Sequence, residues 1–176
     1  MANRKMTLVS RALSDLVAQT EATSGITDAE LDATFSAATA IMSPFSLTPL
    51  RMTISSIEFV SNGATPPVYT ARVKWTAVSN GGTARPCGAT AITQVANTAA
   101  PSATTMPAGL YDAGTIIVAD VQYYYDPPFG GAMLAWSDTQ SGINFSNTTY
   151  MKPRSQTEII YNSATPPTGR TKCTYS

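Results

Sequence analysis

The residue types that carry out most protein catalysis are absent from this sequence or sparse in it. Its 176 residues include no histidine, which excludes Ser-His-Asp and Cys-His nucleophile systems, histidine general bases and zinc sites with an imidazole ligand. Asp112, Asp120, Asp126 and Asp138 lack the spacing of a known calcium-binding loop. A carboxylate pair of the glycosidase kind, Asp120 with Asp126, is the one hydrolytic arrangement that stays open. We therefore predict no enzyme, no metal and no cofactor.

Two further groups of reactive or recognition residues were considered. Cys87 and Cys173 cannot supply a four-thiolate metal site, and by themselves they fit either one disulfide or two buried thiols. The three tyrosines at 123–125 suggest an aromatic platform for sugars or bases. Consecutive residues of a strand point to alternate faces, however, so we expect alternate tyrosines to face the core and the other to face solvent.

Charge and composition limit the classes of partner. Eleven basic and eleven acidic residues give a formal net charge of zero, whereas nucleic-acid and anionic-membrane surfaces need concentrated positive charge. Charged residues make up 12% of the chain, about half of the usual share. A neutral surface rich in Ser and Thr is typical of exported and assembly proteins. No apolar run within the sequence has the length of a membrane span.

The segment 114–125 is predicted to be the strand around which the domain is built. One face carries residues 117, 119, 121, 123 and 125 and is apolar, while the other begins apolar at 116 and 118 and turns polar at Asp120 and Gln122. This pattern is typical of a strand near the middle of an antiparallel sheet. Pro127 and Pro128 have no N–H to donate and end the strand.

Two helices are predicted before the first strand, over about 4–22 and 27–42. In the first, Met6, Val9, Leu13, Leu16 and Val17 recur at helical spacing. The second begins with a capping box, in which Thr27 and Glu30 satisfy each other's backbone N–H groups. A short turn at Gly25 joins the two helices into a hairpin.

From residue 49 the apolar period changes to two, which predicts a sheet. Strands 50–60 and 67–78 form a hairpin, and a bulge at Ser55-Ser56 keeps Ile57 and Phe59 in phase with Met52 and Ile54. The other predicted elements are a mostly irregular segment over 79–113 with a short strand at 91–95, strands at 144–152 and 157–161, and a loosely held tail over 162–176, unless Cys173 fixes it. We therefore predict one α+β domain over 1–176, with a helical hairpin packed on a twisted antiparallel sheet of four to six strands at about 50–161.

Several segments in order resemble the TadE/TadG-like pilus-assembly proteins of alphaproteobacteria. The resemblance covers residues 3–19, 26–31, 40–45, 50–57, 73–75, 117–130 and 150–154. Its most specific parts are Tyr123-Tyr-Tyr-Asp-Pro-Pro-Phe-Gly130 and Tyr150-Met-Lys-Pro-Arg154. The residues that match the family motifs are Tyr123, Tyr125, Pro127, Phe129, Gly130, Tyr150, Pro153 and Arg154.

The resemblance implies a pilin-like fold and a structural role, with no catalytic residue to carry over. Family members have one transmembrane helix directly before the segment that corresponds to residue 3, so we expect an inner-membrane anchor upstream, a domain facing the periplasm, and pilins or other pilus-assembly proteins as partners. The implied compartment is oxidising, and in it a disulfide between Cys87 and Cys173 is expected. The alternative function is a carbohydrate-binding or adhesive module that uses exposed aromatic residues and the long 79–113 segment.

Overall fold

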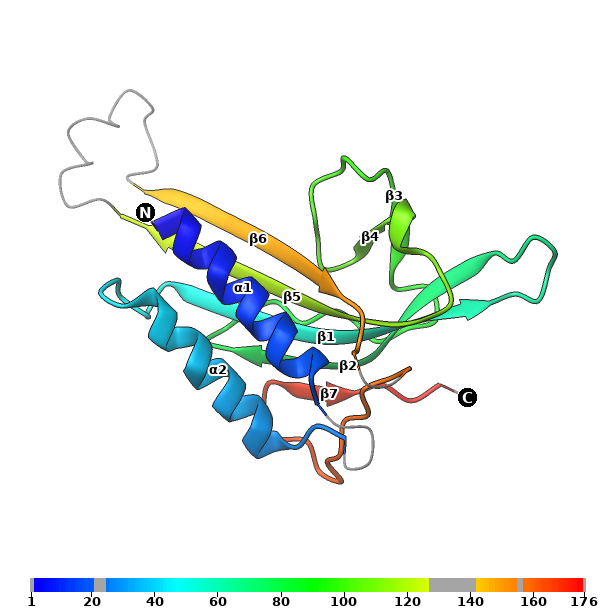
Figure 1. The fold of residues 1–176 in the computed structure, drawn as a ribbon, viewed down its shortest axis with the longest axis horizontal. Coiled ribbons are helices and arrows are strands. Elements are labelled where there is room, and N and C mark those ends of the chain that lie inside the picture. Colours follow the sequence, from blue (N-terminus) through cyan, green and yellow to red (C-terminus); the bar gives the residue numbers. More distant parts are fainter. Residues whose placement is uncertain (1, 21–24, 127–141, 155–156, 176) are drawn as a thin grey trace.

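Two helices and a five-stranded sheet form the framework of the protein (Figure 1). The structure is a computed structural model that describes residues 2–20, 25–126, 142–154 and 157–175. The helices are α1 (Ala2–Ala18) and α2 (Asp28–Met42), and the strands of the main sheet are β1 (Leu50–Ser61), β2 (Tyr69–Ser79), β5 (Gly114–Tyr125), β6 (Ile143–Met151) and β7 (Arg170–Lys172). Their order is β6-β5-β1-β2-β7, and every neighbouring pair is antiparallel. The predicted α+β class is confirmed.

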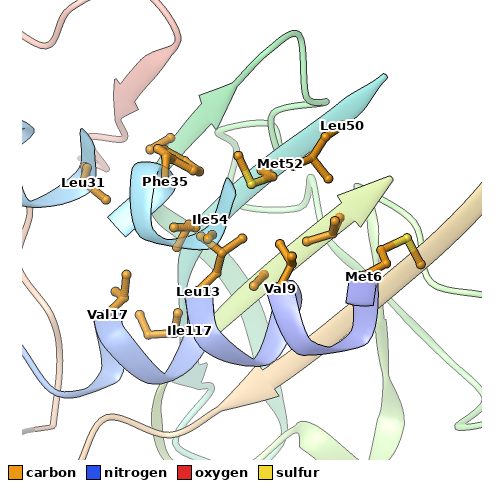
Figure 2. Packing of buried hydrophobic residues seen from close by; sticks show 14 of the residues in the cluster. Met6, Val9, Leu13, Val17, Leu31, Phe35, Leu50, Met52, Ile54 and Ile117 are labelled. Carbon is orange, nitrogen blue, oxygen red and sulfur yellow. The ribbon is translucent and has the colours of Figure 1, made fainter. Parts of the chain in front are cut away.

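The two helices lie side by side on one face of the sheet, which we name the helix face (Figure 1). Figure 2 shows Met6, Val9 and Leu13 of α1 pointing into the space between the helices and the sheet. From the other side, Ile54 of β1 and Ile117 of β5 meet them. All five side chains are fully buried, so the helical layer is held by removal of apolar surface from water.

The ends of the helices differ in part from the prediction. The capping box of α2 is confirmed, because the Glu30 N–H donates to Thr27 Oγ1 (3.3 Å) and the Thr27 N–H donates to Glu30 Oε2 (2.7 Å). Helix α1 ends at Ala18 instead of residue 22, and the Ala18 carbonyl accepts the Arg154 N–H (3.0 Å) from across the domain. Leu16, predicted in the buried stripe, is 43% exposed.

Strand β5 lies between β1 and β6, as its pattern predicts. Residues 117, 119, 121 and 123 are buried on the helix face. Ile116 and Val118 are buried on the opposite face, which we name the second face, in a separate apolar cluster. Beyond Val118, the second face of β5 becomes polar at Asp120 and Gln122. The change from apolar to polar along one face is confirmed.

The predicted bulge occurs at the expected level of the β1–β2 hairpin but in the other strand. The ladder passes from Ser56↔Trp75 to Ile57↔Val73, so the extra residue is Lys74 of β2. Strand β1 continues without a change of phase, and Ile57 lies on the second face instead of joining Ile54 on the helix face. The prediction for residues 55–56 was wrong because β1 is buried on both faces, so its apolar residues do not mark a single face.

Residues 80–113, which we name the excursion, cover half of the second face. They contain β3 (Thr93–Val95), β4 (Thr105–Pro107) and the 3₁₀ turn η1 (Ala108–Leu110). The predicted short strand at 91–95 is present as β3, and it pairs in parallel with β4 in a small sheet of its own. The buried side chains of Ile92 and Met106 pack onto the apolar part of the second face.

The C-terminal segment over 162–176 is fixed to the domain, which is the exception that the sequence prediction made for a tail fastened through Cys173. The last strand is β7, paired with β2 at the sheet edge, and residues 157–161 form no strand apart from one bridge between Tyr161 and Ile26. Tyr161 is buried and its ring lies 5.9 Å from that of Trp75. The main sheet therefore extends to Lys172. This pairing is long-range and has no local pattern in the sequence.

Candidate functional site

The tyrosines of the Tyr-Tyr-Tyr motif divide between the two faces of β5. Tyr123 is 3% exposed, and its ring and that of Tyr125 meet Phe45 edge-on at 6.4 and 6.1 Å. The Tyr123 hydroxyl donates to the Ser46 carbonyl (3.1 Å). Tyr124 lies on the second face and is 41% exposed. The expected alternation is confirmed, and Tyr123 and Tyr125 fasten the segment between α2 and β1 to the sheet.

A second family segment fastens α1. The Arg154 backbone N–H donates to the Ala18 carbonyl, and its guanidinium pairs with Asp15 on the same helix. Near the other end of α1, Lys5 donates to the carbonyls of Ile41 and Ser43 at the end of α2. Pro153 precedes Arg154 directly after β6, whereas the predicted motif residues Pro127, Phe129 and Gly130 lie outside the described residues.

Tyr150, the remaining family-motif residue, lies on the second face of β6 opposite Val118. Its hydroxyl is buried and has no hydrogen-bond partner in the described part of the chain. Burial raises the pKa of this phenol above its ordinary value, and the nearby charges of Arg85 and Asp120 act on it in opposite directions.

Cys87 and Cys173 are joined in a disulfide, with their Cα atoms 5.5 Å apart. The bond links the excursion to the C-terminal segment. Beside it the Cys173 N–H donates to the carbonyl of Lys74, the bulged residue of β2 (2.8 Å), and the Tyr175 hydroxyl donates to the Val73 carbonyl (2.5 Å). The disulfide therefore holds the excursion against the part of the second face that it covers.

A charged cluster at the start of α2 holds the C-terminal segment from the other side. Asp28 accepts hydrogen bonds from Tyr161, from Ser163 (2.9 Å) and from Arg170 (2.6 Å). The hydrogen bonds from Tyr161 and then Arg170 hold the pKa of the Asp28 carboxyl below its ordinary value. Burial, followed by the bond to Asp28, raises the pKa of Tyr161. These contacts attach β7 to the helical layer.

The excursion is fastened to the sheet by a buried ion pair. Arg85 donates to Asp120 through two nitrogens, Nε to Oδ2 (2.8 Å) and Nη2 to Oδ1 (3.0 Å), and Thr148 donates to the same carboxylate (2.6 Å). The Arg85 side chain is 0% exposed and that of Asp120 is 20% exposed. Both oxygens of the Asp120 carboxylate are therefore engaged within the protein.

Beyond this ion pair, the second face is open and polar. Cross-strand register places Arg51 of β1, Gln122 of β5 and Ser146 of β6 in one row across three strands. Beside them, Tyr124 lies opposite Asn144. Arg51, Gln122, Tyr124 and Asn144 line a groove of about 340 Å³, together with Thr48 and Pro49, and Ser146 lines a smaller cavity that adjoins it. We name the larger of the two the open-face groove.

The smaller cavity, of about 80 Å³, continues the groove toward the excursion and shares Arg51 and Gln122 with it. Gly82, Thr83 and residues 101–103 form its wall. A Cβ at residue 82 would lie 2.3 Å from the Met52 carbonyl oxygen, so only glycine allows the excursion to cross β1 this closely.

Among the residues of the open-face groove, the sequence singled out only Tyr124, as one of three tyrosines that suggest an aromatic platform for sugars or bases. Arg51, Tyr124 and Asn144 are far apart in the chain, and only the register of β1, β5 and β6 brings them together. A further signal in the sequence is the polar end of the second face of β5, at Asp120 and Gln122.

Two other kinds of site were sought in the described part of the chain. No three His, Cys, Asp or Glu side chains among the described residues are grouped so that they could hold a metal ion. No helix within the described ranges is long and apolar enough to cross a membrane.

Comparisons with known proteins give no relative for this chain. No protein-family model matches it, and neither a curated protein nor a solved structure matches it significantly.

Proposed function

We propose that this protein is a structural component or assembly factor of a tight-adherence, type IVc-like pilus, of the TadE/TadG-like kind, with a pilin-like fold. As the resemblance implies, its complete form is anchored in the inner membrane, and the domain faces the periplasm or is part of the pilus. Its partners are pilins or other pilus-assembly proteins. The proposal assigns it no enzymatic activity.

The observation that carries the proposal is the position of the motif residues. Tyr123 and Tyr125 fix the segment that enters the sheet from α2, and Arg154 fixes the end of α1. The segments that resemble the family therefore hold a helical layer in a set orientation on a sheet. Contacts of this kind stabilise a scaffold, and they support a structural role for the motif residues.

The disulfide gives independent support for the compartment. Disulfides persist in oxidising compartments such as the bacterial periplasm and are rare in the cytosol. The bond between Cys87 and Cys173 joins segments that lie 86 residues apart in the chain, and its presence supports an oxidising compartment for this domain.

Deletion of the gene in the parent bacterium tests the proposal, with surface pili counted by electron microscopy and adhesion measured in parallel. We expect pili to be lost and to return when the complete gene is supplied. The Tyr124→Ala variant should restore them, whereas Tyr123→Ala should not, because it removes a buried aromatic ring worth roughly 3–5 kcal/mol. Normal pili in the deletion strain would contradict the proposal and favour the alternative of an adhesive module.

A further inference from the structure

We propose that the open-face groove binds an acidic glycan, with the Arg51 guanidinium holding a uronate carboxylate and Tyr124 supporting a sugar ring. This inference rests on the second face of the sheet and is independent of the pilus proposal, which rests on the helix face.

Within the described part of the chain, Arg51, Gln122 and Asn144 make no hydrogen bond or ion pair through their side chains. All three are exposed and line the same groove. Arg4, Arg11 and Lys172 are likewise in no ion pair within the described residues, but Arg51 is the one basic residue among those that line the groove and its inner cavity. A guanidinium left free among neutral amides is available for an external carboxylate, which it can bind through two parallel hydrogen bonds.

The charge of the groove also favours an anionic ligand. Asp120 is the one acidic residue among those that line the groove and its inner cavity. Its carboxylate is already neutralised by the two hydrogen bonds from Arg85. Arg51 therefore contributes a positive charge that the described lining does not balance, and the groove attracts a carboxylate.

The neutral groups suit the hydroxyls of a sugar. The side-chain amides of Gln122 and Asn144 each offer an acceptor and two donors, and the Ser146 hydroxyl can both donate and accept. All three can therefore form hydrogen bonds with sugar hydroxyls, which also both donate and accept. The row from Arg51 to Ser146 crosses three strands and spans about 10 Å, a length that suits a short oligosaccharide. Tyr124 adds an exposed ring whose body is apolar and whose tip is polar.

A peptide fits the groove less well. Peptides that bind sheets commonly add a strand to a free edge, but β1 and β5 at the floor of the groove are hydrogen-bonded on both sides. Recognition from this face must use side chains alone, and most of those here are neutral and polar. These features favour a glycan over a protein segment.

The test measures binding of tetragalacturonic acid and of neutral cellotetraose by calorimetry and by NMR shifts of the labelled domain. We expect the acidic probe to bind, with shifts at Gln122, Tyr124 and Asn144, and cellotetraose to bind at least about tenfold more weakly. Arg51→Met should weaken binding of the acidic probe by about tenfold or more, and Tyr124→Ala should weaken it as well.

The matched control is Arg11→Met, because Arg11 is an exposed arginine on α1 and its loss changes net charge by the same amount. It should leave the affinity within about twofold, and thermal melting should establish that every variant is folded. Absence of binding at millimolar concentration, equal loss in Arg51→Met and Arg11→Met, or equal affinity for the neutral probe would each overturn the inference. None of these results depends on whether the protein builds pili.

Discussion

Removing the charge of Asp120 should destabilise this protein more than removing its partner, Arg85. The two residues form a bidentate ion pair, but they are buried to different degrees. The Arg85 side chain is 0% exposed, whereas the Asp120 side chain is 20% exposed and also accepts a hydrogen bond from Thr148. The change that leaves the more deeply buried charge alone is the more costly one.

The magnitudes follow from what remains in each variant. In Asp120→Asn, the guanidinium stays buried with neutral acceptors only, namely the amide oxygen at residue 120, the carbonyls of Ala103 (3.5 Å) and Thr105 (3.3 Å) and the Met106 sulfur. Leaving one partner of a buried pair uncompensated costs about 3–5 kcal/mol, and we expect about 3 because water reaches Asp120. In Arg85→Met, the carboxylate keeps Thr148 and gains water, so the expected loss is about 2 kcal/mol.

The double variant should lose less than the sum of the two single changes. With Met at 85 and Asn at 120, no charge is buried without a partner, and replacing both members of such a pair is often nearly neutral. We expect the double variant to be about 1 kcal/mol less stable than the wild type, which corresponds to a coupling energy between residues 85 and 120 of about 4 kcal/mol.

The assay is equilibrium unfolding in urea, followed by circular dichroism with the disulfide intact, for the wild type and the three variants. Because a buried pair is screened little by salt, the coupling energy should persist at high ionic strength. Losses that add to within about 0.5 kcal/mol, or a larger loss from Arg85→Met than from Asp120→Asn, would refute this reasoning.

Three further predictions concern other contacts. Replacing Cys87 and Cys173 with serine should lower the unfolding free energy by up to about 4 kcal/mol, and unfolded, unreduced wild-type protein should have no reactive thiol; two reactive thiols would contradict the bond. Asp28→Asn should reduce the loss of stability that the wild type shows as pH falls. The hydrogen bond from Tyr161 lowers the pKa of the Asp28 carboxyl, so the stabilisation by this carboxylate is present above the unfolded pKa of 3.8 and is lost as pH falls through the folded pKa. The same acid dependence of stability in the variant and the wild type would count against this. Tyr150→Phe removes a buried hydroxyl without a partner, so unfolding should show equal or greater stability, and a loss above about 1 kcal/mol would mean that the hydroxyl is bonded.

Elements that depend on local pattern were predictable. The alternation in β5 and the capping box of α2 rest on residues close in sequence, and both are confirmed. The strand β1 shows the limit of prediction from local pattern. Because the helices cover one face and the excursion covers the other, Ile54 and Ile57 are buried on opposite faces. The prediction assumed that these apolar residues share one face, and it therefore placed the bulge in β1 instead of β2.

Contacts between distant segments were not predictable from the pattern. The pairing of Arg85 with Asp120 spans 35 residues, and that of Arg170 with Asp28 spans 142. Nothing local distinguishes these arginines from exposed ones. The open-face groove depends on strand register in the same way, since a shift of one residue in β6 would replace Asn144 with a side chain that faces the helices.

The two proposals use opposite faces of one sheet, and adjacent residues can therefore separate them. Tyr123 lies under the helical layer and Tyr124 lies in the open-face groove. If both proposals hold, loss of the Tyr123 ring weakens the scaffold and everything that depends on it. Loss of the Tyr124 ring leaves the scaffold intact and removes only glycan binding. A Tyr124→Ala variant that folds normally and binds tetragalacturonic acid as tightly as the wild type would show that this tyrosine does not support the sugar ring.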